Sequence, residues 1–348
     1  MNKKLTEDPA AIAARADFAA ALGGCARDEL VDVDARVIRA VGDPHAYVVA
    51  NPLRMLRVVR LMSQLARWGF SLDLNLAEAI IANSRLIQQV RGRLVRGEFE
   101  QILTSNHPLV GLDLMMDSGL MHQLFPELVD LNGPGGDQDP YWHPEGNTWV
   151  HSRLVVQGLV GASFTLMMGG LLHDIGKPAT QVRHANGRIS NPGHDAIGAV
   201  IAKAICERLE LTRKESRTIC KYVAMHMTMH CGPEMRPARL ARLLQRSDLP
   251  ELVRLQHADA TGKDGEQRSL CSFYAAAVEQ MACAEHDAQC CAEVVALVRG
   301  GLLIGMGYQP GPQFAVIIEH ALEAQIEGVF TDADGARSWV VDNFGEPR

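Results

Sequence analysis

Apolar residues recur along most of the chain every three to four positions, which is the spacing of an amphipathic helix. In residues 52–68 they fall at positions 53, 56, 59 and 62, and Pro52 stands where a helix can begin. The same spacing predicts helices over residues 75–91, 94–104, 108–119, 151–160, 194–210, 212–230, 236–246, 273–299 and 312–326. Strand signals are confined to the first 45 residues, mainly to 30–41. The fold class predicted from this pattern is mainly α.

Stretches rich in glycine, proline and polar residues interrupt the helical pattern in three places. They lie at residues 131–140, 261–269 and 307–312. The first separates an N-terminal helical module from a central one, and the second separates the central module from a helical tail that contains the third. A chain of 348 residues is long enough for two or three modules.

One uncharged stretch, residues 154–172, has about the length of a membrane span. Four glycines interrupt it, and the apolar run continues into a histidine and an aspartate. We therefore expect two buried helices that meet at a glycine-containing bend, and no membrane as a partner. The eight cysteines form no CxxC pair, and no apolar stretch follows the N-terminal lysines. Both observations predict a cytoplasmic protein with reduced thiols.

The net charge of −7, from 34 basic and 41 acidic residues, excludes a protein that is positively charged all over. Locally the balance reverses, because Asp73 and Glu78 are the only acidic residues between positions 54 and 97. The arginines of this region that we expect to contact an RNA backbone are Arg54, Arg57, Arg60, Arg91, Arg93 and Arg96. The alternative is a solvated arginine face, or arginines held in intramolecular ion pairs.

The strongest chemical signal is the segment LLHDIGKP, residues 171–178, in which His173 and Asp174 are adjacent. An imidazole and a carboxylate at the end of a buried helix can reach one cation together, and an unpaired buried aspartate is costly. The other residues of this kind occur in the order His151, His194, His226, His230 and Asp259. For each histidine alone, a hydrogen-bonded core residue is the simpler interpretation. For His173 and Asp174, the alternative is a buried structural ion pair.

The ordered set together with HDIGKP resembles the HD superfamily of metal-dependent phosphohydrolases. The resemblance implies that one divalent ion is held by His151, His173, Asp174 and Asp259. It implies that His194 and His226 hold a second ion or contact the substrate phosphate. The residues expected to act in catalysis are Asp174, Lys177, His194 and His226, while His230, His143, His184 and His257 are weaker candidates. Such ligands suit Mg²⁺, Mn²⁺, Ni²⁺ or iron, and a metal-bound water is a good nucleophile.

The flanking segments resemble a narrower family. PLRMLRVVRLMSQLARWGFSLD and RLVRGEFEQILTSNHPLVGLDLMMDSGLMHQLFPEL are similar to the neck of class II tRNA nucleotidyltransferases, the bacterial CCA-adding enzymes and poly(A) polymerases. WHPEGNTWVH and RISNPGHDAIG are similar to the HD domain that many bacterial CCA-adding enzymes carry. The resemblance implies a remnant of the nucleotidyltransferase head in residues 1–45, a helical RNA-binding neck in 46–130, the HD domain in 141–265 and a helical tail in 266–348.

The segment before the neck departs from that family. The head needs a glycine loop followed by an Asp-x-Asp pair that binds two Mg²⁺ ions, and the Asp-x-Asp at residues 32–34 follows no such loop. The segment RADFAAAL, residues 15–22, has alanine where the family's corresponding segment has polar residues. The nucleotide-selecting Glu-Asp-x-x-Arg motif has become ANPLR at residues 50–54. We therefore expect no nucleotidyltransferase activity.

Two functions from different classes follow from these resemblances. The first is a metal-dependent phosphohydrolase that acts on phosphate esters, with 2′,3′-cyclic or terminal phosphates of RNA or nucleotides as substrates. The alternative is a non-catalytic RNA-binding subunit of a split tRNA nucleotidyltransferase. Both predict a tRNA-like RNA or a nucleotide as the partner and no DNA, and the chain is a candidate homodimer.

Overall fold

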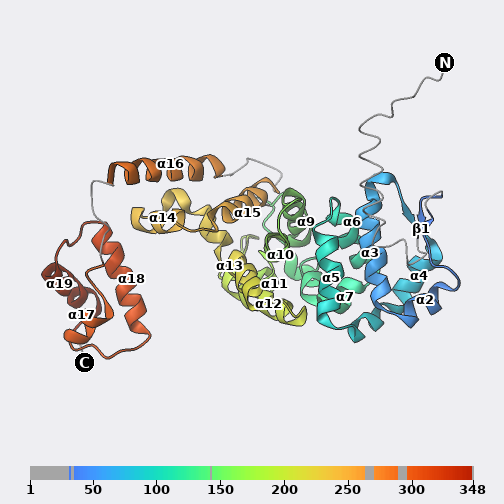
Figure 1. The fold of residues 1–348 in the computed structure, drawn as a ribbon, viewed down its shortest axis with the longest axis horizontal. Coiled ribbons are helices and arrows are strands. Elements are labelled where there is room, and N and C mark those ends of the chain that lie inside the picture. The colour runs from blue at the N-terminus through green and yellow to red at the C-terminus, as the bar shows by residue number, and fades with distance from the viewer. Residues whose placement is uncertain (1–30, 33–34, 142, 263–269, 289–295, 347–348) are drawn as a thin grey trace, which may run out of the picture. The chain divides into compact units, whose positions relative to one another are not determined.

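The computed structural model describes residues 31–32, 35–141, 143–262, 270–288 and 296–346, which form two compact units (Figure 1). Among these residues the first unit holds positions up to 229 together with 254–262, and the second holds 230–253 with the positions from 270 onward. Of the predicted head remnant, residues 1–30 and 33–34 lie outside the described residues. The four-part division drawn from the resemblance stays a prediction.

The N-terminal part of the first unit consists of short helices and a small sheet. Its elements are β1 (Val31–Asp32), β2 (Val37–Ile38), α2 (Pro44–Ala50), α3 (Leu53–Leu65), η1 (Ala66–Trp68), β3 (Ser71–Leu72), α4 (Leu74–Asn83), η2 (Ser84–Gln89), α5 (Gly92–Leu103), α6 (Pro108–Asp117), α7 (Leu120–Leu124), α8 (Pro126–Asp130) and η3 (Pro134–Gly136). Strand β2 pairs antiparallel with β1 and parallel with β3. The sheet therefore joins the start of the described chain to the segment that follows α3.

The rest of the first unit carries the histidines. Its elements are α9 (Thr148–Gly158), α10 (Phe164–Leu172), α11 (Lys177–Thr180), the hairpin of β4 (Val182–Arg183) and β5 (Ile189–Ser190), α12 (His194–Arg208), α13 (Arg213–His230) and most of α15 (Leu249–Thr261). The second unit contains η4 (Gly232–Glu234), α14 (Pro237–Leu244), α16 (Cys271–Ala288), α17 (Gly300–Gly305), α18 (Gln313–Ile326) and α19 (Ala333–Phe344). Near the C-terminus, α17, α18 and α19 share a small core around Leu303, Ile317 and Val340.

Helix α3 is the centre of the N-terminal part, and it packs against α5 and α6. Its apolar face is buried, as the spacing of Leu56, Val59 and its neighbours predicts. Gly111 of α6 makes the close approach possible, because a β-carbon there would lie 2.3 Å from Ser63 Oγ and 2.4 Å from Ile102 Cγ2. The N-terminal helices therefore form a tightly packed bundle.

Ion pairs join the N-terminal helices to the histidine-bearing helices within the first unit. Arg208 at the end of α12 binds Glu127 of α8 through both of its terminal nitrogens, at 2.5 and 3.0 Å. Arg96 of α5 lies 2.6 Å from Glu215 of α13, and Arg153 of α9 lies 2.6 Å from Asp113 of α6. Helix α9 also packs on α6, and α10 packs on α5.

The mainly α fold predicted from the hydrophobic pattern is confirmed. The uncharged stretch 154–172 is broken as expected, because α9 ends at Gly158, Gly161 has a φ of +82°, and Ser163 caps α10. Among the described residues no helix is both long enough and apolar enough to cross a bilayer.

Three details of the prediction were wrong. Helix α15 was missed, because buried polar residues such as Gln256 and Asp259 replace apolar ones on its inner face. Strands also occur beyond residue 45, as β3 and as the β4–β5 hairpin, where two-residue pairings leave no alternating pattern. The helix predicted to reach residue 299 does not, because Arg299 is extended and precedes α17.

Candidate metal centre

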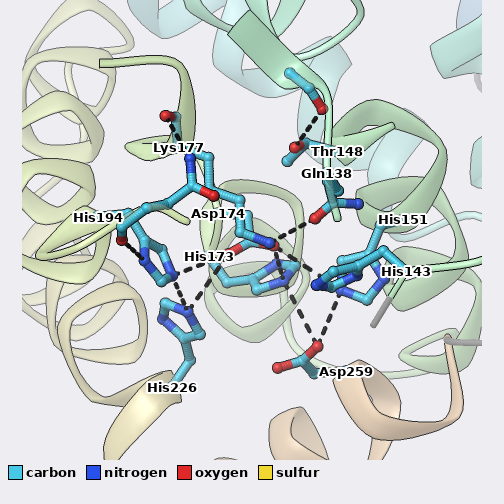
Figure 2. A network of polar contacts seen from close by, with 12 residues as sticks. Gln138, His143, Thr148, His151, His173, Asp174, Lys177, His194, His226 and Asp259 are labelled. Atoms are coloured by element: carbon cyan, nitrogen blue, oxygen red, sulfur yellow. Dashed lines mark hydrogen bonds and ion pairs between the residues drawn. The ribbon is translucent and has the colours of Figure 1, made fainter. Parts of the chain in front are cut away.

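Six side chains from five helical segments of the first unit converge on one buried centre (Figure 2). His173 and Asp174 lie in the turn after α10, and His151 lies in the first turn of α9. The others are His194, His226 and Asp259, which lie on α12, α13 and α15. All six are buried, with relative exposures between 0% and 7%. The structure thus brings together every residue for which the sequence predicted a metal-binding role.

Gly176 brings the turn after α10 close to α12. A β-carbon at this position would lie 2.1 Å from the backbone oxygen of His194 and 2.6 Å from the backbone nitrogen of Gly198. Only a glycine lets the two backbones approach so closely. This contact sets Asp174 beside the first residue of α12.

The first group of ligand atoms consists of His151, His173 and Asp259, whose ligand atoms all lie within 4.8 Å of one another. The Nε2 atom of His151 lies 2.9 Å from Asp259 Oδ1. The Nε2 atom of His173 lies 3.9 Å from the same oxygen. Asp174 Oδ2 is 3.2 Å from His173 Nε2 and 4.0 Å from His151 Nε2.

The second group consists of Asp174, His194 and His226. Asp174 Oδ1 lies 3.2 Å from His194 Nε2 and 3.5 Å from His226 Nε2. The two Nε2 atoms are 3.1 Å apart. Because its other oxygen faces the first group, Asp174 joins the two groups through one carboxylate.

Three of the histidines are oriented in the same way by the backbone. Their Nδ1 atoms donate to the carbonyl oxygen three residues earlier, at 2.8 Å for His173, 2.7 Å for His194 and 2.6 Å for His226. A ring that carries its proton on Nδ1 presents the lone pair of Nε2 to the centre. The fold therefore aims one nitrogen of each ring at the carboxylates.

The residues present fit a divalent cation in the first group. His173 Nε2 is fully buried, and among the described residues it makes no hydrogen bond of good geometry, although Asp174 Oδ2 lies 3.2 Å away. A polar atom buried in this way is costly unless something satisfies it. Two imidazole nitrogens and carboxylate oxygens from Asp174 and Asp259 are a donor set that Mg²⁺, Mn²⁺, Ni²⁺ and iron accept.

Burial and charge set the protonation of the second group. Burial alone raises the pKa of Asp174, but the charges of His173 and Lys177 and hydrogen bonds from the histidines hold it well below its usual range. Burial lowers the pKa of His226. Burial also lowers that of His194, but the hydrogen bond and charge of Asp174 outweigh it and raise the pKa. His194 therefore holds a proton more readily than His226.

Lys177, at the start of α11, is buried beside the carboxylate. Its Nζ lies 2.6 Å from Asp174 Oδ2 and donates to Gln138 Oε1 at 2.5 Å. Gln138, in turn, donates to the carbonyl oxygen of Gly146 at 3.2 Å. The lysine is thus fixed at the centre, and it does not point into solvent.

Sequence reasoning missed two residues of the centre, Gln138 and Glu145, which lie in the loop between η3 and α9. Glu145 Oε1 is 2.9 Å from Nδ1 of both His143 and His151. Burial raises the pKa of Glu145, but hydrogen bonds from the two histidines lower it to about 2. The available signal was a glutamate between His143 and the start of the helix that carries His151. His184 lies elsewhere, in the β4–β5 hairpin, bonded to Ser190 Oγ at 2.8 Å.

The arginines predicted to contact RNA have different surroundings. Arg60 is buried, with Nε 2.7 Å from Glu98 Oε2, and Arg57 Nε lies 3.4 Å from Glu98 Oε1. For these two, the alternative of intramolecular ion pairs describes the structure. Arg54 donates to the Tyr47 carbonyl oxygen at 2.9 Å, and Arg96 binds Glu215. Arg91 and Arg93 are exposed at the start of α5.

Comparison with known proteins agrees with this geometry. Residues 69–131 match the family described as a probable RNA and SrmB-binding site of polymerase A, and residues 149–263 match the HD domain. A multifunctional CCA protein from Shewanella frigidimarina is 27% identical over 252 residues, which cover 69% of this chain and 59% of the relative. The chain thus spans less than two thirds of that relative's length.

Among solved structures, the CCA-adding enzyme of Bacillus stearothermophilus in complex with CTP is similar in fold, with a TM-score of 0.52 at 17% identity. The match covers 88% of this chain and 65% of that one. Together with the two family matches, this confirms the resemblance seen in the sequence. The chain carries a match to the polymerase A region followed by a match to the HD domain, and in this order it resembles the neck and HD domain of class II tRNA nucleotidyltransferases.

Proposed function

We propose that this protein is a metal-dependent phosphohydrolase that cleaves phosphate esters, with 2′,3′-cyclic or terminal phosphates of RNA or nucleotides as its substrates. The observation that carries the proposal is a single buried carboxylate, Asp174, placed between two groups of imidazole nitrogens. One group offers an ion imidazole nitrogens and a carboxylate oxygen, and the other leaves polar atoms for a substrate. The match of this region to the HD domain supports the same class of reaction.

His151, His173, Asp174 and Asp259 would hold the ion. When bound, a divalent ion lowers the pKa of a coordinated water and so supplies a nucleophile near neutral pH. The chain's own contribution is to orient these ligands: Nδ1 of His173 is tied to the Gly170 carbonyl oxygen. The surrounding helices bury these ligands.

Lys177, His194 and His226 would act on the phosphate. Lys177 is fixed next to Asp174, so its positive charge would offset the charge of a bound phosphate. Hydrolysis forms a bond between phosphorus and the water oxygen and breaks the ester bond, and the leaving oxygen then needs a proton. His194 would donate that proton from Nε2, since its pKa is raised by Asp174.

The matched RNA-binding region supports RNA as the larger part of the substrate or as a partner. Arg91 and Arg93 are the exposed residues of the predicted set, so they are the arginines proposed to contact the phosphate backbone. The buried Arg60 would instead stabilise the fold.

The test is a hydrolysis panel on the metal-free chain with each divalent ion added in turn. The substrates are 2′,3′-cyclic AMP, 2′-AMP and tRNA with defined ends. We expect turnover that His173→Ala abolishes and that His184→Ala leaves unchanged, because the His184 side chain is bonded to Ser190 of its own hairpin, away from the centre. Hydrolysis that continues unchanged in a chelator would overturn the proposal.

A non-catalytic RNA-binding subunit is the second candidate, and the match to an RNA-binding region favours it. It predicts RNA binding without turnover of any substrate in the panel. Metal would then have no effect on the protein beyond its stability. The panel and a filter-binding assay with tRNA together separate the two candidates.

A further inference from the structure

Glu145 lies outside the six converging residues but touches one of them. It comes from the loop before α9, and its side chain is 3% exposed. Its Oε1 atom lies 2.9 Å from His151 Nδ1, on the side of the ring opposite Asp259. The same oxygen is 2.9 Å from His143 Nδ1. His151 is therefore held between two carboxylates.

His151 differs in this respect from the other three histidines. His173, His194 and His226 each use a backbone carbonyl oxygen three residues earlier as the acceptor for Nδ1. His151 lies in the first turn of its helix, and a carboxylate six residues earlier takes that place. A charged acceptor binds the N–H more strongly than a carbonyl and makes the opposite nitrogen more basic.

The proton of the neutral ring has two possible positions, and a carboxylate favours each. Asp259 Oδ1, 2.9 Å from Nε2, attracts a proton to the nitrogen that faces the centre. Glu145 Oε1 attracts it to Nδ1. A proton on Nε2 blocks that nitrogen as a metal ligand, whereas a proton on Nδ1 leaves it free.

We propose that Glu145 is a positioning residue, which keeps the His151 proton on Nδ1 so that Nε2 is available to a divalent ion. The proposal rests on the proposed metal-dependent function. Without Glu145, the carboxylates left near the ring among the described residues are Asp259, 2.9 Å from Nε2, and Asp174, 4.0 Å from it. Both face Nε2, so the proton moves to that nitrogen. The ion must then displace that proton, so its affinity falls. His143 assists by holding the same oxygen of Glu145.

A separate cation between His143, Glu145 and His151 is the competing interpretation, since their ligand atoms lie within 4.8 Å of one another. It requires His151 to bind ions through both nitrogens at once. The ring would then lose both of its protons, which costs much more than keeping one proton on the nitrogen that faces Glu145. The arrangement in which Glu145 contacts Nδ1 directly, at 2.9 Å, is therefore the one we test.

The experiment uses the full chain, stripped of metal, in wild-type form and as Glu145→Gln and Glu145→Ala. Glu127→Gln is the matched control, because Glu127 is a partly buried carboxylate that binds Arg208 away from the centre. Calorimetric titration with Mn²⁺ gives affinity and stoichiometry. Long-range ¹H–¹⁵N spectra of the histidine side chains give the position of the His151 proton, and thermal melting checks the fold.

We expect Glu145→Gln to bind Mn²⁺ about 10–100-fold more weakly. Removing a residue that orients a metal ligand typically lowers metal affinity by this factor. Glu145→Ala should show the His151 proton on Nε2, and the control should match wild type. Unchanged affinity with the proton still on Nδ1 overturns the inference, even where wild type hydrolyses phosphate esters. A loss of one bound Mn²⁺ at unchanged affinity also overturns it, in favour of the separate cation.

The design separates this inference from the proposed function. If wild type binds no Mn²⁺ and hydrolyses nothing, then the proposed function fails. If wild type binds and hydrolyses while Glu145→Gln does the same, only the role of Glu145 fails. The isosteric Gln variant keeps the test valid if the Ala variant does not fold.

Discussion

Replacing Glu98 by alanine tests how the arginines of α3 are used. Arg60 Nε lies 2.7 Å from Glu98 Oε2, and the two side chains are 8% and 11% exposed. Gln64 accepts from Arg60 at 3.0 Å, but Gln64 carries no charge. Because a guanidinium cannot lose its proton in a protein, Glu98→Ala leaves a buried positive charge without its carboxylate. The N-terminal helices should then be strongly destabilised.

The expected loss follows from the burial of the pair. Removing one partner of a buried ion pair costs about 3–5 kcal/mol, out of a total stability of about 5–15 kcal/mol for a domain. At about 2–4 °C per kcal/mol for a unit of this size, the melting temperature falls by about 6–20 °C. Arg57 is 29% exposed. Arg57→Ala should therefore cost about 1 kcal/mol or less.

Urea unfolding, monitored by circular dichroism, measures the free energy of unfolding of Glu98→Ala and of Arg57→Ala. The double variant Arg60→Met with Glu98→Leu is the control. Replacing both partners by apolar residues of similar volume should restore most of the stability. If Glu98→Ala costs less than about 1 kcal/mol, the pair behaves as a surface pair and the reasoning is refuted.

Three further predictions concern the same unit. The double variant Arg91→Ala with Arg93→Ala should weaken tRNA binding, measured by filter binding from low to moderate salt. The slope of log affinity against log salt should fall by roughly 0.7 per arginine. An unchanged slope argues for a solvated arginine face. Burial raises the pKa of Glu127, but hydrogen bonds from Arg208 outweigh it, so the pKa lies below its ordinary value of 4.5. Their pair, worth about 1 kcal/mol or less, stabilises the fold above that value and is lost as pH falls through the lowered pKa; urea midpoints of wild type and Arg208→Ala should converge at acid pH. In Gly176→Ala the added β-carbon would lie 2.1 Å from a backbone oxygen of α12. The variant should lose about 1–3 kcal/mol of stability or more, seen in thermal melting, and should bind less metal. Wild-type stability in this variant would contradict the close approach.

The order of the histidines and aspartates carried the resemblance to the HD superfamily, and that resemblance implied which residues converge. His173 and Asp174 are adjacent, so their proximity needs no fold at all. His194, His226 and Asp259 lie at helix starts or on buried helix faces, where regular packing brings distant positions together. Periodicity and motif order are properties of the sequence, so this part of the centre was accessible from it.

Other features depend on contacts that no local pattern encodes. Glu145 and Gln138 belong to an irregular loop, and their partners are known only once the loop is folded against α9 and α11. The region counted as locally basic, residues 54–97, ends one residue before Glu98. The carboxylate of Glu98 is the partner of Arg57 and Arg60. Charge counts in a window could not reveal that pairing.

The same limit applies to helix α15. Its inner face carries Gln256 and Asp259 as well as leucines and alanines, all of them buried. A polar residue on that face lowers the periodic signal by which amphipathic helices are recognised. Asp259 therefore weakens the helical pattern of α15 and, from the same buried face, contacts His151 at the centre.

The central claim is that hydrolysis depends on an ion held by His151, His173, Asp174 and Asp259. The most direct measurement is the initial rate of 2′,3′-cyclic AMP hydrolysis by the chain before chelation, after thorough chelation, and after Mn²⁺ is returned, with bound metal measured in each sample. The account predicts that the rate falls with the bound metal and returns with it, and that Asp174→Asn, with its fold intact in a thermal melt, shows neither. A rate that is the same in all three samples would contradict it.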